Sequence, residues 1–99
     1  MNPLIEIANQ IFQIEKKLTK DGVSDQYARY IQKIKQSLSE LKISFHDPEG
    51  EKYSDTRTDI EANIVGDGKT DFVITQAIKP IVFEDDKVVQ MGVVIVEGK

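Results

Sequence analysis

The side chains of this sequence that could share acid–base chemistry gather after residue 45. The single histidine, His46, precedes Asp47, and a His–Asp pair can act as a general base with the group that orients it. Neighbouring residues of a strand point to opposite faces, however, and no serine nucleophile motif accompanies the pair. The pattern therefore favours a surface histidine before a turn.

Three closely spaced carboxylates, those of Asp47, Glu49 and Glu51, suggest a second kind of chemistry. Paired carboxylates hydrolyse glycosidic bonds when they flank a deep cleft and one of them has a raised pKa. A chain of 99 residues leaves little room for such a cleft. The carboxylates are therefore a weak indication of a glycosidase.

Phosphate and metal sites are also weakly indicated. Residues 66–69, Gly-Asp-Gly-Lys, lack the rest of a phosphate-binding loop and predict a hairpin turn instead. The acidic turn at 84–86 lacks the alternating ligands and mid-loop glycine of a calcium loop. The absence of cysteine excludes thiolate nucleophiles and cysteine-based zinc sites. We expect no cofactor, no metal and no catalytic residue, and a binding function rather than an enzyme.

Charge and hydropathy restrict the partners. The formal net charge is −4, which disfavours nucleic acid and anionic membranes. No apolar run approaches the roughly 20 residues that a membrane-spanning helix needs, and we recognise no signal peptide. The cytoplasm is the expected compartment.

The first 42 residues have the apolar spacing of two helices. Steps of three and four residues form a heptad seam on each helix, with a break near Gly22. The first seam consists of Leu4, Ile7, Ile11, Ile14 and Leu18, and the second of Tyr27, Ile31, Ile34, Leu38 and Leu41. Two such helices joined by a short turn predict an antiparallel hairpin.

Two helices alone cannot bury both seams. A second copy would complete a four-helix bundle, and we expect this homodimer, with the ten seam residues as the dimerisation surface. The alternative is that the hairpin lies on the sheet that follows it. Ile5, Ala8 and Phe12 widen the stripe of the first helix, which predicts contact with more than one neighbour.

From residue 43 onward the pattern is that of strands, with apolar residues in alternation. The expected strands are 43–45, 58–65, 72–78, 81–83 and 88–96. The turn at 66–69 should join the second and third of them as a hairpin. The expected fold class is α+β: a dimerising helical hairpin over 1–42, then a small, mainly antiparallel, partner-binding β domain over 43–99.

Several short segments stand in a particular order along the chain. They are Leu4-x-x-Ile7-x-Asn9-x-Ile11-x-x-x-Glu15, the helix 34–41 leading into Ile43, Asp47-Pro48-x-Gly50-x-x-Tyr53, Ile60-Glu61-Ala62, and the strand 87–96. This order resembles the bundle and β portions of the GrpE family, the nucleotide exchange factors of DnaK-type chaperones. The resemblance covers nearly all of the chain.

The sequence also departs from that family. The family's Phe-Asp-Pro is replaced by Tyr53-Ser54-Asp55, and its Arg-Pro-Ala by Gln90-Met91-Gly92. Ile60 stands where the family has the histidine of His-Glu-Ala, and the family's long N-terminal helix has no counterpart. The scaffold can therefore be shared while the chaperone contact is altered.

The resemblance implies a homodimer whose β domain binds the nucleotide-binding domain of a DnaK-type chaperone and promotes ADP release. The candidate contacts are Ile81, Phe83, Gln90 and Met91, for which ordinary packing of the β domain is the other interpretation. Two alternatives stay open. One is a GrpE-like scaffold used as a non-exchanging interaction module, and the other is an unrelated small α+β adaptor.

Overall fold

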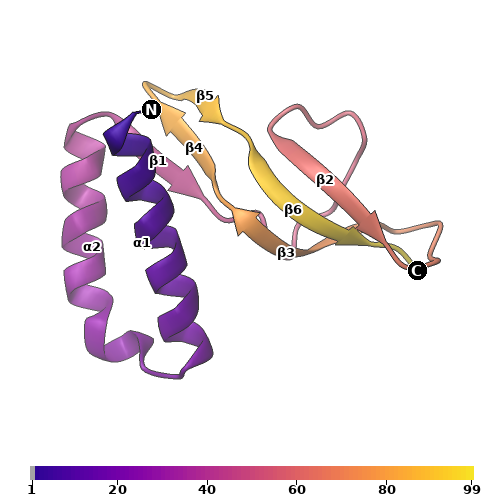
Figure 1. Ribbon diagram of the computed structural model, residues 1–99, viewed down its shortest axis with the longest axis horizontal. Helices are drawn as coiled ribbons and strands as arrows, with labels where there is room; N and C mark the ends of the chain where they lie inside the picture. Colours follow the sequence, from indigo (N-terminus) through magenta and orange to yellow (C-terminus); the bar gives the residue numbers. More distant parts are fainter. Residues whose placement is uncertain (1) are drawn as a thin grey trace.

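The computed structural model describes residues 2–99, apart from the side chain of Ser24. Within this range the chain forms two helices followed by six strands in two small sheets (Figure 1). The expected α+β fold, with a helical hairpin before a β domain, is confirmed.

The hairpin consists of α1 (Pro3–Lys20) and α2 (Ser24–Glu40). Asn2 caps α1, because its Oδ1 accepts a hydrogen bond from the backbone N–H of Leu4 at 2.9 Å. Pro3 suits the first helical position, since its fixed φ is helical and its missing N–H is not needed there. Gly22 has a φ of +73°, the left-handed conformation that commonly follows a helix end. The chain then returns antiparallel beside α1 (Figure 1).

The six strands are built around one long antiparallel ribbon. They are β1 (Ile43–His46), β2 (Ile60–Val65), β3 (Val73–Lys79), β4 (Ile81–Glu84), β5 (Lys87–Gln90) and β6 (Gly92–Glu97). In the ribbon, β4 pairs with β5 and β3 pairs with β6, with interruptions at Pro80 and Met91. Near the helices β1 pairs antiparallel with β4, and farther away β2 pairs parallel with β6 (Figure 1). The domain is therefore mainly antiparallel, as expected.

The prediction that residues 66–69 form a hairpin turn is wrong. β2 and β3 do not pair with each other, because β6 lies between them and pairs with both. Val94 and Val96 of β6 are fully buried, so this apolar strand takes the centre of its sheet. The loop instead meets the end of the chain, where the N–H of Lys69 donates to the carbonyl of Lys99 at 2.9 Å.

A two-residue turn joins β4 to β5. Asp85 and Asp86 have φ values of +51° and +65°. Positive φ at both central residues is the type I′ geometry, whose twist matches that of the flanking strands. The N–H of Asp85 also donates to the carbonyl of Lys42 at 3.0 Å, which ties the turn to the end of the hairpin.

Two hydrophobic clusters join the helices to the strands. In the larger, Phe12 of α1 is 2% exposed and belongs to one cluster with buried residues of β2, β3, β4 and β6. In the smaller, Ala8 of α1 packs with Leu38 of α2, Ile43 of β1 and Val82 of β4. α1 therefore contacts both α2 and the β domain, which are the two neighbours that its wide apolar stripe predicts.

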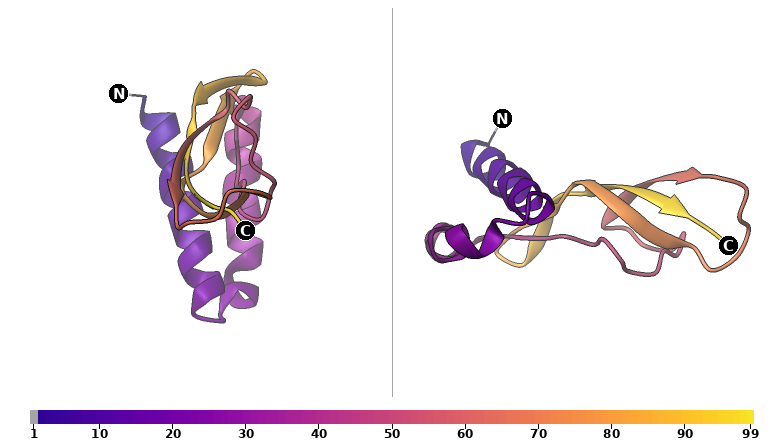
Figure 2. Two further views of the ribbon diagram at one scale, coloured as in Figure 1. Left: turned by 90° about the vertical axis from the view of Figure 1, so that its right-hand side faces the viewer. Right: turned by 90° about the horizontal axis from the view of Figure 1, so that it is seen from below.

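The strands project from one side of the hairpin. Figure 2 shows, in its right-hand view, the two helices at one end and the strands reaching away from them. We refer to residues 43–99 as the β arm. The molecule measures 41 × 32 × 19 Å. No strand among the described residues covers the opposite side of the hairpin (Figures 1 and 2).

Replacing Phe12 tests how the arm is held. Phe12→Ala should lower the free energy of unfolding by about 3–5 kcal/mol, because it leaves a cavity among the strands. Phe12→Leu keeps most of the volume and should cost less. Urea denaturation at one fixed protomer concentration measures both. A loss below about 1 kcal/mol for Phe12→Ala would show that the ring is not the main anchor of the arm.

Candidate functional site

The ten expected dimerisation residues differ in burial. The buried ones are Ile11, Ile31 and Leu38, and the half-buried ones are Leu4 and Leu18. The remaining five are exposed, and we call them the outer helical face: Ile7, Ile14, Tyr27, Ile34 and Leu41. Half of the predicted seam residues are therefore only partly covered by the described residues 2–99.

The outer helical face runs along both helices. Ile7 and Ile14 lie two turns apart on α1. Tyr27, Ile34 and Leu41 repeat at the same seven-residue interval on α2 and at its end, so each set follows one line of its helix. Successive residues of an α-helix are about 100° apart around the helix axis. Each exposed set therefore lies beside the buried residues of its helix, on the side away from the β arm. The exposed line continues the apolar stripe of each helix past the residues that the arm and the other helix cover.

Ile81 lies in the core, so its assignment as a candidate contact is wrong and the other interpretation, ordinary packing, holds for it. Its side chain is 1% exposed and belongs to the same cluster as Phe12. The next residue, Val82, belongs to the other cluster, so β4 is covered on both faces. Phe83 is half-buried and packs against the larger cluster. A partner reaches neither Ile81 nor the buried part of Phe83.

Gln90 faces α1 rather than open solvent. Its Nε2 donates to Asn9 Oδ1 at 2.7 Å and to the Pro80 carbonyl at 3.0 Å. Its Oε1 accepts from Asn9 Nδ2 at 3.0 Å. Both polar ends of the Gln90 amide are therefore engaged within the protein.

Met91 is the one expected contact that is well exposed, at 41%. Val88 and Val89 beside it are 43% and 41% exposed, and neither was predicted from the sequence as a contact. We call these three residues the β5 patch. Val88 and Val89 are exposed because β5 is a short edge strand that pairs, within residues 2–99, only with β4. Met91 follows β5 at the interruption before β6. A four-residue strand after a tight turn was the signal that could have found them.

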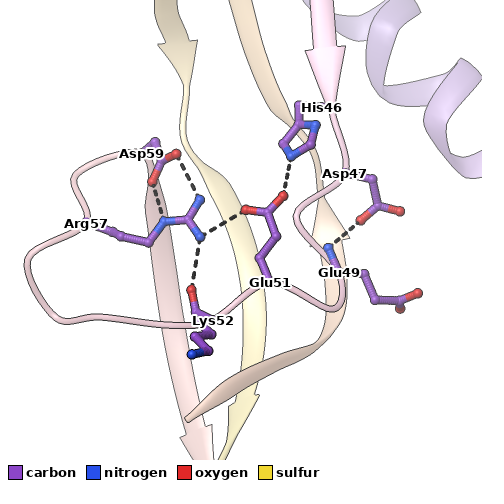
Figure 3. A network of polar contacts seen from close by, with 7 residues as sticks. All are labelled: His46, Asp47, Glu49, Glu51, Lys52, Arg57 and Asp59. Atoms are coloured by element: carbon purple, nitrogen blue, oxygen red, sulfur yellow. Dashed lines mark hydrogen bonds and ion pairs between the residues drawn. The ribbon is translucent and has the colours of Figure 1, made fainter. Parts of the chain in front are cut away.

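A network of ion pairs closes the loop between β1 and β2 (Figure 3). Arg57 donates from Nε and Nη2 to the two oxygens of Asp59, each at 3.0 Å. Its Nη1 donates to Glu51 Oε1 at 3.1 Å and to the Lys52 carbonyl at 3.3 Å. The second oxygen of Glu51 pairs with Nε2 of His46. The network links the end of β1 to the residue before β2.

The residues singled out for acid–base chemistry do not meet one another. His46 turns to Glu51, whereas Asp47 Oδ1 accepts from the backbone N–H of Glu49 at 3.0 Å (Figure 3). Asp47 and Glu49 share Lys16 of α1 as an ion-pair partner, at 3.3 Å each. The carboxylates are arranged as partners of cations, not as a pair facing a substrate. Within residues 2–99, no group of three or more His, Cys, Asp or Glu side chains is placed to hold a metal ion.

An open hollow of about 1210 Å³ lies between α1 and the β arm. Its wall on α1 includes Lys16, Lys17 and Lys20, and its wall on the arm includes Asp47 and Glu49. Glu15 and Asp21 also line the α1 side. Acidic and basic side chains are therefore mixed, and the hollow has no single sign of charge that would select one ligand.

The charges of the network perturb two pKa values. Bidentate hydrogen bonding from Arg57 holds the pKa of the Asp59 carboxyl below its ordinary value, against a smaller opposing effect of burial. The hydrogen bond to Asp59 likewise holds the pKa of Arg57 above its ordinary value. The network is thus most stable with Asp59 ionised.

No family model, curated protein or solved structure matches this chain. The GrpE resemblance therefore stays a prediction. Across residues 2–99, neither helix has the length and apolar character needed to cross a membrane.

The lowered pKa of Asp59 predicts acid sensitivity. The pair stabilises the fold above the unfolded-state pKa, about 3.9 for Asp, and this contribution disappears as the pH falls through the folded-state value. Asp59→Asn should therefore lower the urea midpoint near neutral pH and flatten its decline below about pH 4. Thr58→Ala, in the same loop, is the non-titrating control. Equal pH profiles for wild type and Asp59→Asn would contradict the prediction.

Proposed function

We propose that this protein is a GrpE-like homodimer that binds the nucleotide-binding domain of a DnaK-type chaperone and promotes the release of ADP. The single observation that carries the proposal is the outer helical face. It supports a bundle of two hairpins, and the order of helical hairpin and β arm is the one that the resemblance implies. The proposed compartment is the cytoplasm.

The outer helical face has the properties of a surface that another apolar surface covers. Isolated exposed apolar side chains are common on monomers, but contiguous apolar patches mark interaction sites. Here the exposed side chains are large and repeat along two adjacent helices, with exposures from 38% for Ile34 to 56% for Leu41. A second hairpin carries the complementary seven-residue spacing, so a two-fold axis would bring matching seams together.

Burial of the outer helical face offsets the cost of association. Full burial of an aliphatic side chain contributes about 1.5–3 kcal/mol, and half-exposed side chains contribute roughly half of that. A two-fold interface counts every residue twice, so five residues per chain give ten such contributions. Their sum is of the same order as the roughly 4–15 kcal/mol that association costs in lost freedom. We therefore expect a dimer whose dissociation is measurable by dilution.

The β5 patch is the proposed contact for the chaperone. Val88, Val89 and Met91 are exposed on an edge strand, whereas Ile81 is buried. Exchange would follow from differential binding: a protein that binds the open nucleotide-binding domain better than the closed one shifts it toward the open state. The ADP affinity then falls by the same coupling factor, and no residue of this chain performs chemistry.

One observation favours a second candidate function, a GrpE-like scaffold that binds a partner without exchange. Gln90-Met91-Gly92 stands where the family has Arg-Pro-Ala. Gln90 is engaged with Asn9 and Pro80 rather than free for a chaperone. Binding to the chaperone without faster ADP release would support this candidate.

A carboxylate on the outer helical face should split the dimer. Ile34→Asp and Ile14→Asp bury an unpaired charge only in the bundle, because both residues are exposed in the single chain. Each variant should elute as a monomer with unchanged helical circular dichroism, as measured by light scattering after size exclusion. Gln32→Asp adds the same charge on another face of α2 and should stay dimeric. Dimeric Ile34→Asp at micromolar concentration would exclude this interface.

Stopped-flow release of a fluorescent ADP analogue from a DnaK-type chaperone of the same source tests the exchange function. Wild type should accelerate release. Met91→Asp and Val89→Asp should raise the concentration needed by about tenfold or more, the effect of losing one central contact. Ile64→Asp, on exposed β2 at the far end of the arm, should act like wild type.

The outcomes separate the parts of this proposal. No acceleration at saturating wild type would exclude the exchange function. Acceleration that depends on Ile64 and not on Met91 would keep the exchange function and move the contact to the far end of the arm.

A further inference from the structure

Three polar side chains of α1 hold three different parts of the β arm. Asn9 exchanges two hydrogen bonds with Gln90 of β5, at 2.7 and 3.0 Å. Gln13 Nε2 donates to the carbonyl of Ile78 in β3 at 2.9 Å. Lys16 pairs with the two carboxylates after β1. These α1 positions are four and three residues apart, so they share one face of the helix.

Phe12 lies between these polar contacts and acts as the pivot of the arm. Its buried ring supplies the apolar contact between α1 and the arm. A contact at one place does not fix the angle between the arm and the helix. Asn9 and Lys16 are two helical turns apart, about 10.5 Å along the axis, on either side of that pivot. Contacts on both sides of a pivot prevent the arm from swinging along the helix.

The Asn9–Gln90 pair is the most specific of these contacts. It is partly buried, whereas the Gln13 and Lys16 contacts are exposed, where water and salt compete with them. Its geometry is also determined: the Pro80 carbonyl only accepts, so Gln90 must turn its nitrogen toward it. That orientation in turn fixes which way the Asn9 amide points.

We propose that Asn9 and Gln90 are positioning residues that set the angle between the β arm and the helical hairpin. Gln90 lies between Val89 and Met91 in the chain, so holding it also places the β5 patch relative to the outer helical face. This inference rests on the proposed function only for its consequence in exchange. The angle itself is a property of the single chain.

The test uses the absence of cysteine in the natural chain. Spin labels at Lys17→Cys on α1 and Glu61→Cys on β2, both exposed positions, report the distance between hairpin and arm. Labelled chain is diluted with unlabelled chain, so that distances within one chain dominate. Wild type should give one narrow distance distribution by pulsed electron resonance.

Isosteric changes give the sharpest comparison. Gln90→Glu places a carboxylate oxygen against the Pro80 carbonyl. Asn9→Asp places a carboxylate oxygen against Gln90 Oε1. Each change should therefore broaden and shift the distribution of distances between the two labels. The double change Asn9→Asp with Gln90→Arg should restore a narrow distribution, because a guanidinium donates to both a carboxylate and a carbonyl. Asn9→Ala is a further variant that removes the contact without adding charge, and alanine favours the helix.

The same variants are then compared in ADP release. The single variants should lose acceleration while staying dimeric, and the double variant should recover it. An unchanged distance distribution in both Gln90→Glu and Asn9→Ala, or no recovery in the double variant, would overturn the proposal. If wild type itself fails to accelerate release while the distances respond as expected, the proposed function fails and the positioning role stands.

Discussion

Burial of one aromatic ring, Phe12, between α1 and the strands is the contact on which the rest of the architecture depends. The ring joins α1 to one buried cluster whose other members lie on β2, β3, β4 and β6. T-shaped contact with Phe45, at 6.5 Å between ring centroids, extends the same cluster toward β1. Without this ring, α1 would hold the arm mainly through the polar contacts of Asn9, Gln13 and Lys16 and the smaller Ala8 cluster.

Using one side of α1 for the arm has a consequence for the other side. When a helix has a wide apolar stripe, strands can cover one edge of the stripe and the other helix of the hairpin can cover its middle. The remaining edge, with Ile7 and Ile14, is then left in solvent. α2 repeats this division, with Ile31 and Leu38 buried and Ile34 exposed. The apolar surface that the hairpin cannot cover therefore collects on one face, opposite the arm.

The sequence predicts the parts of this fold that depend on local signals. The helices follow from heptad spacing, the Asn2 cap and Gly22, all of which act within a few residues. Strand positions also follow from alternation, although the expected last strand is interrupted at Met91. The pairing of the strands does not follow from local signals. A turn-like segment at 66–69 cannot reveal that β6 lies between β2 and β3 and pairs with both.

The roles of the candidate site residues are also predictable only in part. The seam residues were predictable as a set, but which of them face solvent depends on where the arm docks. Ile81 and Met91 look alike as apolar residues of a hairpin, yet one is 1% exposed and the other 41%. Gln90 could not be assigned from sequence at all, since its partner Asn9 is 81 residues away. Long-range packing decides these roles, and no local pattern encodes it.

We expect a second copy of the chain to cover the outer helical face, and sedimentation equilibrium of the unmodified protein measures this directly. The homodimer should have a mass near twice the 11.2 kDa of one chain at micromolar concentrations and should dissociate on dilution. A mass of 11.2 kDa at every concentration would contradict it.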